Sequence, residues 1–350
     1  MKDTKVARLT GTAADKTVFD DAGRIIRGGG LVVFPTETVY GIGANGLDEA
    51  ACRSIYAAKG RPGDNPLILT VPDVTEGKKL VSYIPPLAEK LMKAFWPGPL
   101  TVVLPRREIV PDAVTGGLDT VALRCPAHAG CREFLRAAGV PVAGPSANLS
   151  GRPSPTTAAE AFRDMDGRVD MIIDGGAAAI GVESTIVEVL EQVVTILRPG
   201  GVTEEMLAEF TPYVTMDAHL LTDTGVPKAP GMKYRHYAPS APMRVFVGSV
   251  AAVAAAMEAA RHTAAGDKKA VGYLVSAETA ERLGLFDEPF YTWGRHGVKE
   301  ELAANVYTGL LFFDDKPVDL ILAEGVTAGG IGTAVMNRLK KAAGGAVVDV

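Results

Sequence analysis

The hydrophobic pattern of the first two hundred residues alternates between helical and strand spacing. Apolar residues three and four positions apart predict helices over 15–27, 48–58, 87–95 and 126–138. We expect Asp48 to cap the second of these helices and Pro126 to occupy the first turn of the fourth. Short apolar runs predict strands over 31–34, 67–71, 100–104, 120–123, 141–143, 185–189 and 193–197, the last two as an antiparallel pair. This alternation predicts a layered α/β domain.

The pattern stops and then resumes in the last third of the chain. Residues 211–242 have no clean periodicity and contain five prolines, which is typical of a linker. Beyond it, strands are predicted over 245–247, 270–275 and 318–322, and helices over 249–261, 298–313 and 333–343. We therefore expect a domain over 1–211, a basic, proline-rich linker or lid over 212–242, and a smaller α/β domain with a parallel sheet over 243–350.

Composition narrows the class of protein. The chain has 350 residues, of which 47% are hydrophobic, and its net charge is −5. Residues 1–240 carry −3 and residues 241–350 carry −2, so neither part is suited to a general electrostatic grip on nucleic acid. The three cysteines, the lack of an apolar leader and the shortness of the longest apolar run, 250–257, predict a cytoplasmic protein with no membrane span.

Two familiar motifs are poor matches. Gly41, Gly43 and Gly46 form a G-x-G-x-x-G sequence, but several residues separate it from the preceding strand, so a tight turn is expected rather than a dinucleotide site. Cys125, His128 and Cys131 lack the spacing of a common zinc site, and we expect no tightly bound metal. The histidines are scattered and no G-x-S-x-G sequence occurs, which disfavours a nucleophilic triad.

Cations in acid-free, Gly/Pro-rich stretches carry more information. Arg53, Lys59 and Arg61 lie between Glu49 and Asp64, and the linker and the loops on either side of it contain Arg152, Arg198, Lys228, Lys233, Arg235 and Arg244. Lys and Arg beside small hydroxyl and amide residues are typical of a phosphate site. Ordinary surface loops also carry such cations, and that alternative is open from composition alone. An enzyme of this kind would act by positioning and electrostatics.

Several motifs, taken in order, carry a family resemblance. They are Pro35-Thr-Glu-Thr-Val-Tyr-Gly-Ile-Gly43, Ala58-Lys-Gly-Arg-Pro62, Asn65-Pro-Leu67, Pro145-Ser-Ala-Asn148, Ser150-Gly-Arg-Pro-Ser-Pro-Thr156, Glu183-Ser-Thr-Ile186 and Leu197-Arg-Pro-Gly200. The set resembles the YrdC-like family. The linker sequence 229–239 and the tail 332–339 resemble its long, two-domain form. The resemblance covers nearly the whole chain and implies a YrdC-like twisted mixed sheet with helices, followed by a smaller Rossmann-like α/β domain.

The resemblance also implies an activity. Members of this form make L-threonylcarbamoyladenylate and pyrophosphate from L-threonine, bicarbonate or CO2, and ATP, which enters as its Mg²⁺ complex. The product would pass to a tRNA threonylcarbamoyl transferase complex, and weak binding of tRNA is compatible with this role. Two alternatives stay open: a non-catalytic RNA-binding module, and an enzyme that forms a carbamoyl adenylate from carbamoyl phosphate.

Site residues follow from the same motifs. The resemblance makes Lys59 and Arg61 catalytic residues facing the triphosphate, and the predicted ATP contacts are Lys59, Arg61, Asn65, Thr120, Ser146, Asn148, Ser154, Arg198, Tyr234 and His236. The last two would close the linker over the nucleotide. The predicted L-threonine contacts are Thr38, Thr70, Arg124, Gly144 and Ser184. The family often has His at the position of Thr70, and Thr or Ala at that of Gly144, so both departures bear on the threonine pocket.

Overall fold

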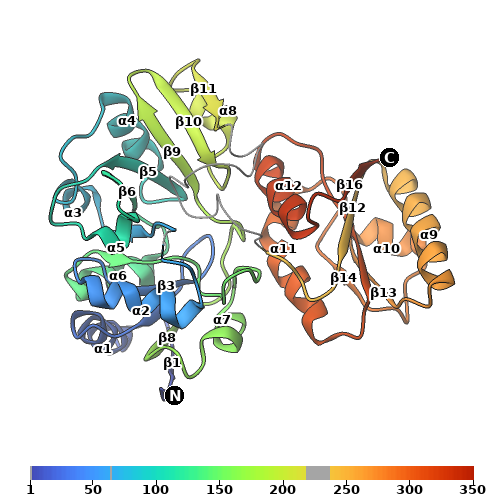
Figure 1. The fold of residues 1–350 in the computed structure, drawn as a ribbon, viewed down its shortest axis with the longest axis horizontal. Helices are drawn as coiled ribbons and strands as arrows, with labels where there is room; N and C mark the ends of the chain where they lie inside the picture. Colours follow the sequence, from blue (N-terminus) through green and yellow to red (C-terminus); the bar gives the residue numbers. More distant parts are fainter. Residues whose placement is uncertain (1, 64, 218–236) are drawn as a thin grey trace. The chain divides into compact units, whose positions relative to one another are not determined.

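The structure is a computed structural model, and it describes residues 2–63, 65–217 and 237–350. The chain forms two compact units: unit 1 comprises Met1–Ser150 and Ser154–Tyr234, and unit 2 comprises Gly151–Pro153 and Arg235–Val350. Both are α/β, as the pattern predicts (Figure 1). Among the described residues, no helix is long and apolar enough to cross a bilayer.

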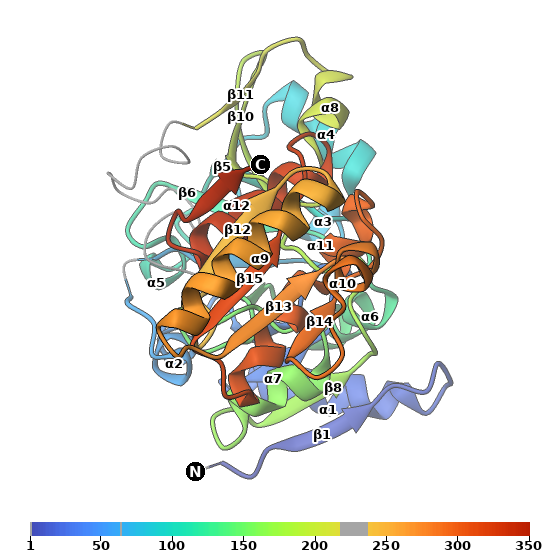
Figure 2. The ribbon, with the colours of Figure 1, turned by 90° about the vertical axis from the view of Figure 1, so that its right-hand side faces the viewer.

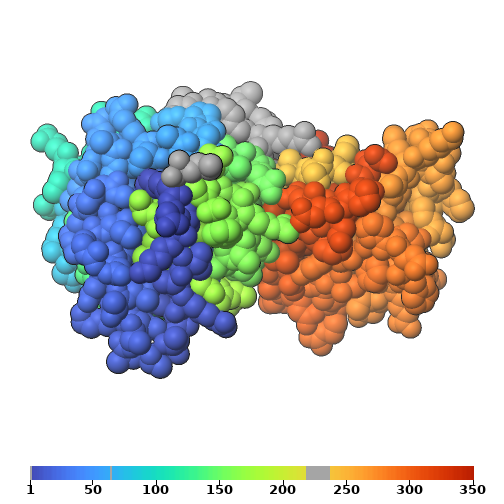
Figure 3. All heavy atoms as spheres, turned by 90° about the horizontal axis from the view of Figure 1, so that it is seen from below, coloured from blue at the N-terminus to red at the C-terminus, as the bar shows by residue number. Residues whose placement is uncertain are grey.

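Unit 1 is built on a mixed, eleven-stranded sheet with the order β1-β8-β2-β3-β7-β4-β6-β5-β9-β10-β11. Its strands are β1 (Lys5–Arg8), β2 (Val32–Phe34), β3 (Gly41–Asn45), β4 (Ile68–Thr70), β5 (Leu100–Pro105), β6 (Thr120–Arg124), β7 (Val142–Ala143), β8 (Met171–Asp174), β9 (Thr185–Leu190), β10 (Val193–Arg198) and β11 (Val214–Met216). The parallel pairing of β1 with β8 brings the N-terminal segment beside residues far along the chain, as the dark blue and green spheres of Figure 3 show.

Helices pack on both faces of this sheet. They are α1 (Asp15–Arg27), α2 (Glu49–Lys59), α3 (Val74–Lys78), α4 (Pro86–Phe95), α5 (Asp112–Thr115), α6 (Ala129–Ala138), α7 (Ala158–Met165) and α8 (Glu204–Ala208). Helices α1 and α6 bury their apolar stripes against β2, β7 and β8 on one face. Helices α2, α4 and α7 contribute to the larger core on the other face, which extends along the sheet to β10.

Three details differ from the predictions. The predicted linker contains β11, which pairs in parallel with β10 and so extends the sheet. Helix α6 begins at Ala129 rather than in the turn at Pro126, because the His128 imidazole accepts the Cys131 N–H at 3.1 Å and caps the helix one turn later. The segment from Gly41, predicted as a tight turn, is the strand β3, paired antiparallel with β2.

The glycines of β3 are explained by one aromatic ring. A Cβ at Gly41 would lie 2.7 Å from the Phe34 ring, and one at Gly43 would lie 2.9 Å from it and 2.5 Å from Val142. A Cβ at Gly144 would lie 3.2 Å from the same ring. Packing against Phe34 favours glycine at these positions, which accounts for the G-x-G pattern of β3 without a dinucleotide site.

Unit 2 is a smaller sheet in which all pairings are parallel, with the order β14-β13-β15-β12-β16. Its strands are β12 (Met243–Val247), β13 (Val271–Val275), β14 (Phe290–Thr292), β15 (Leu320–Glu324) and β16 (Val347–Asp349). The helices are α9 (Val250–Gly266), α10 (Ala277–Leu283), α11 (Lys299–Phe312) and α12 (Ile331–Ala342). Figures 1 and 2 show α9 and α10 on one face and α11 and α12 on the other, a doubly wound, Rossmann-like arrangement.

Gly43→Ala tests the packing under Phe34. The added methyl must displace the Phe34 ring or Val142, so we expect the free energy of unfolding to fall by about 1–3 kcal/mol. Urea unfolding followed by circular dichroism measures the change. Gly63→Ala is the matched control, because a Cβ there meets no atom of the described residues within 4 Å. Equal midpoints for the two variants would contradict the proposed role of the ring.

Candidate active site

Strand alternation brings many of the predicted site residues to one face of the unit 1 sheet. Thr70 pairs with Arg124 and with Val142, and Arg124 pairs with Thr101, so all of these side chains lie on the face that α1 and α6 cover farther along the sheet. The neighbouring residues Leu69 and Leu123 point into the large core on the opposite face. On this face of the sheet, α1 and α6 pack against β2, β7 and β8, and the site residues lie on β4, β5 and β6.

An apolar patch lies on this same half-face. It is formed by one residue from each of five strands, β4, β5, β6, β9 and β10: Ile68, Val103, Ala122, Ile186 and Leu197. All five are buried. The patch gives the polar residues at the strand ends a rigid, apolar base, which is how small-molecule sites combine shape with a few oriented polar groups.

Arg124 ends β6 and forms an ion pair with Glu37, which is distant from it in the sequence. Its Nη2 donates to Glu37 Oε1 at 2.7 Å, and the second carboxylate oxygen accepts the Ala127 N–H at 3.0 Å. Glu37 lies in the loop between β2 and β3, next to the buried Thr38. Of the predicted threonine contacts, Arg124 is paired with the Glu37 carboxylate, Thr70 lies beside Arg124 in register, and Thr38 follows Glu37 in the chain.

Ser184 is the centre of a second group. Its hydroxyl lies 2.7 Å from that of Thr101, and Arg198 donates from Nη2 to its carbonyl at 3.0 Å and to its hydroxyl at 3.2 Å. Beside it, the buried Ser154 hydroxyl donates to Glu183 Oε1 at 2.7 Å. The structure therefore connects Ser184, predicted for threonine, to Arg198 and places it beside Ser154, both predicted for the nucleotide.

Lys59 ends α2 and is almost fully buried. Its ammonium donates to the carbonyls of Ser146 and Asn148, and the Ser146 hydroxyl donates to Asn148 Oδ1 at 2.5 Å. Burial, followed by the positive charge of Arg61, holds the pKa of Lys59 well below its usual range, and the charge of Asp164 acts in the opposite direction. A group with such a pKa is poised to respond to an added negative charge.

Arg61, Asn65 and Thr120 belong to the other end of the β4–β6 pair. Arg61 Nη2 donates to the carbonyls of Asn65 and Pro66 at 3.3 and 3.2 Å. Asn65 is buried, and its Oδ1 has no hydrogen-bond partner within the described parts of the chain. Thr120 begins β6, four residues before Arg124, which corresponds to about 13 Å along a strand. Thr120 is thus separated from the threonine group.

Two predicted contacts cannot be located. Tyr234 and His236 lie outside the described residues. The next residue, Tyr237, is buried in unit 2 with a left-handed φ of 65°, and its ring lies 5.2 Å from that of Tyr307. The predicted closure of the linker over a nucleotide stays a prediction.

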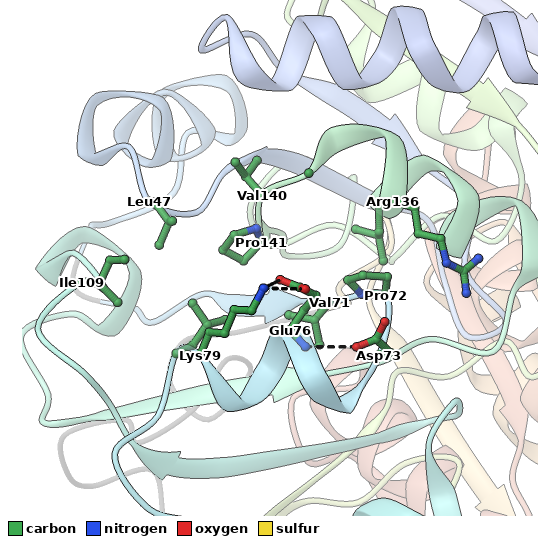
Figure 4. Close-up of a pocket in the computed structure, with 13 residues that line it drawn as sticks. Leu47, Val71, Pro72, Asp73, Glu76, Lys79, Ile109, Arg136, Val140 and Pro141 are labelled. Carbon is green, nitrogen blue, oxygen red and sulfur yellow. Dashed lines mark hydrogen bonds and ion pairs between the residues drawn. The ribbon is translucent and has the colours of Figure 1, made fainter.

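A separate cavity of about 510 Å³ opens at the far end of β4 (Figure 4). Val71 and Pro72 line it, as do Glu76 and Lys79, which form an ion pair 2.7 Å long. Its lining includes Leu80 from the large core and Leu135 of α6 from the opposite face, so the cavity lies beyond the end of β4 rather than on one face of the sheet. It holds none of the residues predicted for substrate.

The sequence reasoning missed three residues of the site, of which Glu183 and Thr101 are buried and Glu37 is half-buried. Glu37 and Glu183 both lie inside quoted motifs, directly beside Thr38 and Ser184, so a signal was available. Thr101 stands in an apolar strand, and only its polar character at an alternating position marks it. The other predicted contacts lie in this region of unit 1, but the structure does not test which ligand each would touch.

Comparison with known proteins gives a consistent result. A family model for Sua5, YciO and YrdC, described as "Telomere recombination", matches residues 24–200, and a second, described as "Threonylcarbamoyl-AMP synthase, C-terminal domain", matches residues 189–344. The threonylcarbamoyl-AMP synthase of Pyrococcus abyssi is 46% identical over 94% of this chain and 95% of its own length. That of Bacillus subtilis is 43% identical over 93% of each. The crystal structure of P. abyssi Sua5 complexed with L-threonine has a TM-score of 0.92 at 42% identity, covering 99% of each chain.

Thr101→Val tests the group around Ser184. Valine keeps the shape of threonine but removes the hydroxyl that lies 2.7 Å from Ser184 Oγ. We expect the free energy of unfolding to fall by about 1 kcal/mol, the typical net value of one buried hydrogen bond. Thr195→Val is the control, because its hydroxyl is exposed and lies 3.5 Å from that of Thr215. A loss no larger than that of the control would contradict a structural role for the Thr101 hydroxyl.

Proposed function

Because the chain belongs to the Sua5/YciO/YrdC family and carries the C-terminal domain of threonylcarbamoyl-AMP synthases, we propose that it forms L-threonylcarbamoyl-AMP and pyrophosphate from L-threonine, bicarbonate or CO2, and ATP. The observation that carries this proposal is 46% identity to a threonylcarbamoyl-AMP synthase along nearly the full length of both chains. The site supports it, since it combines buried cations with an apolar base and a carboxylate-binding arginine.

The chemistry requires two anions to meet. The amino group of L-threonine first takes up CO2 to give a carbamate. A carbamate oxygen then attacks the α-phosphorus of ATP, a new P–O bond forms, and the bond to the bridging oxygen breaks to release pyrophosphate. Lys59, Arg61 and Arg198 would lower the repulsion between the reactants and stabilise the charge that develops on the leaving group.

The two ends of the β4–β6 pair separate the roles. Arg124, with Thr38, Thr70, Gly144 and Ser184, would hold the amino acid at one end. Asn65, Thr120, Ser146, Asn148 and Ser154 would contact the nucleotide from the other end and from the loops beside it. Ser184 and Arg198 contact one another, and they would lie near the point where the reacting groups meet.

The surroundings of the reaction follow from its chemistry. ATP would enter as its Mg²⁺ complex, with the ion as part of the substrate. The adenylate would be consumed by a transferase that modifies tRNA, and a net charge of −3 over residues 1–240 makes any binding of tRNA by this chain weak. The three free, buried cysteines suit a reducing compartment such as the cytoplasm.

Omission of substrates tests the activity. We expect release of pyrophosphate only when MgATP, L-threonine and bicarbonate are all present, with a product of the mass of threonylcarbamoyl-AMP. Release that needs carbamoyl phosphate in place of threonine and bicarbonate would mean a carbamoyl adenylate. No release from folded protein that retains tRNA on a column at low salt would favour an RNA-binding module.

Lys59 gives a separate prediction about protons. Burial, followed by the positive charge of Arg61, holds its pKa well below the ordinary value of 10.5. The phosphates of a bound nucleotide favour the charged form and raise this pKa, so MgATP binding takes up a proton at any pH between the pKa of the free protein and that of the complex. Calorimetry in buffers of different ionisation enthalpy measures this uptake.

The controls separate Lys59 from other lysines. Lys59→Met is expected to abolish the buffer-dependent part of the heat, whereas Lys93→Met, at an exposed position on α4, should leave it unchanged. Equal proton uptake by wild type and Lys59→Met would show that Lys59 does not face the phosphates. Circular dichroism of both variants confirms that they fold.

A further inference from the structure

We propose that Glu37 is a positioning residue that sets the guanidinium of Arg124 for the carboxylate of the amino-acid substrate, an inference that rests on the proposed function. Glu37 would not touch the reacting atoms. It would act by fixing which edge of Arg124 is available to threonine.

The carboxylate of Glu37 is itself held at both oxygens. Oε1 accepts from Arg124 Nη2 at 2.7 Å, and Oε2 accepts from the Ala127 N–H at 3.0 Å. The backbone around Glu37 is also tied down, because its carbonyl accepts the Ile180 N–H at 2.8 Å and the carbonyl of Thr38 accepts the Gly181 N–H at 3.1 Å. A carboxylate with so little freedom can impose one orientation on its partner.

The pair is removed from solvent. The exposed fraction of the side chain is 9% for Arg124 and 11% for Glu37. A buried ion pair contributes little net stability, but removing one partner leaves a buried charge without compensation. The alignment of Arg124 therefore depends on Glu37 rather than on water.

One donor of Arg124 has no partner. Its Nε is buried and forms no hydrogen bond within the described ranges, 2–63, 65–217 and 237–350. A buried donor left unsatisfied is unfavourable, and an acceptor that satisfies it gains correspondingly. A substrate carboxylate is the acceptor that a guanidinium edge binds best, through parallel N–H···O bonds.

The ion pair leaves only part of the Arg124 guanidinium for a second ligand. Glu37 occupies an Nη2 donor of the guanidinium, so a second carboxylate must bind through the donors that remain, among them Nε. On β6, Arg124 is flanked in register by Thr70 and Thr101, whose side chains lie on the same face. Threonine bound to Arg124 would lie against these two residues, within the group that contains Ser184.

Glu37→Gln is the variant that tests this role. Glutamine keeps the size of the side chain, but only its amide oxygen can accept a hydrogen bond and its NH2 group donates. It therefore cannot accept from both Arg124 and the Ala127 N–H. We expect the KM and the dissociation constant for L-threonine to rise about tenfold to a hundredfold, the scale of a lost charge-assisted hydrogen bond. The KM for ATP should change less than about twofold. Glu37→Asp, which keeps the charge, should recover part of the affinity.

Asp112→Asn is the matched control. It breaks an ion pair of similar length, 2.6 Å to Arg106, that lies elsewhere in unit 1 with an exposed carboxylate. This variant should leave both KM values at wild-type level. Calorimetric titration with L-threonine alone, together with thermal unfolding of each variant, completes the set.

The outcomes distinguish the two proposals. A wild-type affinity for threonine in Glu37→Gln, or equal weakening for threonine and ATP together with a lowered unfolding temperature, would overturn the role of Glu37. If the wild-type protein binds threonine but releases no pyrophosphate, the proposed function fails, while the calorimetric comparison still measures whether Glu37 positions Arg124.

Discussion

The buried ammonium of Lys59 is the constraint on which the candidate site depends. It ends α2 inside the protein, where a charge is tolerated only if it is well solvated by fixed dipoles or is neutralised. The carbonyls of Ser146 and Asn148 provide those dipoles, so the loop that follows β7 is held against the end of α2. The Ser150 N–H reinforces this by donating to the Lys59 carbonyl at 2.9 Å. The position of the loop therefore depends on the buried amino group of Lys59.

The sheet supplies the second half of the site through alternation. In β4, β5 and β6, residues that point one way build the large core, and residues that point the other way form the apolar patch and the polar groups around it. Phe34 marks the boundary on this face, because its ring covers Gly43 and Gly144 where the helix-covered half ends. A side chain at position 144 would press on the ring and on the Ile42 carbonyl, 3.2 Å from each. Packing therefore favours glycine at this position, because a methyl group would require these neighbours to shift by a few tenths of an ångström.

Local chemistry made most elements predictable from sequence, and contacts between distant residues explain the failures. Asp48 caps α2 as expected, because the signal lies within three residues. The glycines of β3 were interpreted as a turn, since the ring that requires them lies in another strand. The start of α6 was misplaced because His128 is an uncommon cap that the helix itself brings into position. The site shows the same contrast between local and distant signals. The sequence motifs indicate Ser146 and Asn148, whereas the role of Thr101 follows only from the fold, because β5 places its hydroxyl beside that of Ser184.

Two acidic residues in a site for anions need a physical reason. Glu37 and Glu183 each add a negative charge close to where ATP and a carbamate would bind, and so weaken general attraction for anions. Each is fixed by donors, Glu37 by Arg124 and Ala127, and Glu183 by the buried Ser154 hydroxyl. Buried pairs of this type contribute orientation more than affinity. A site that relied on unpaired cations would bind many phosphates and carboxylates equally well. Glu37, which occupies one donor of Arg124, instead restricts binding to ligands whose charges match the donors that remain. A reaction between two specific anions requires this property.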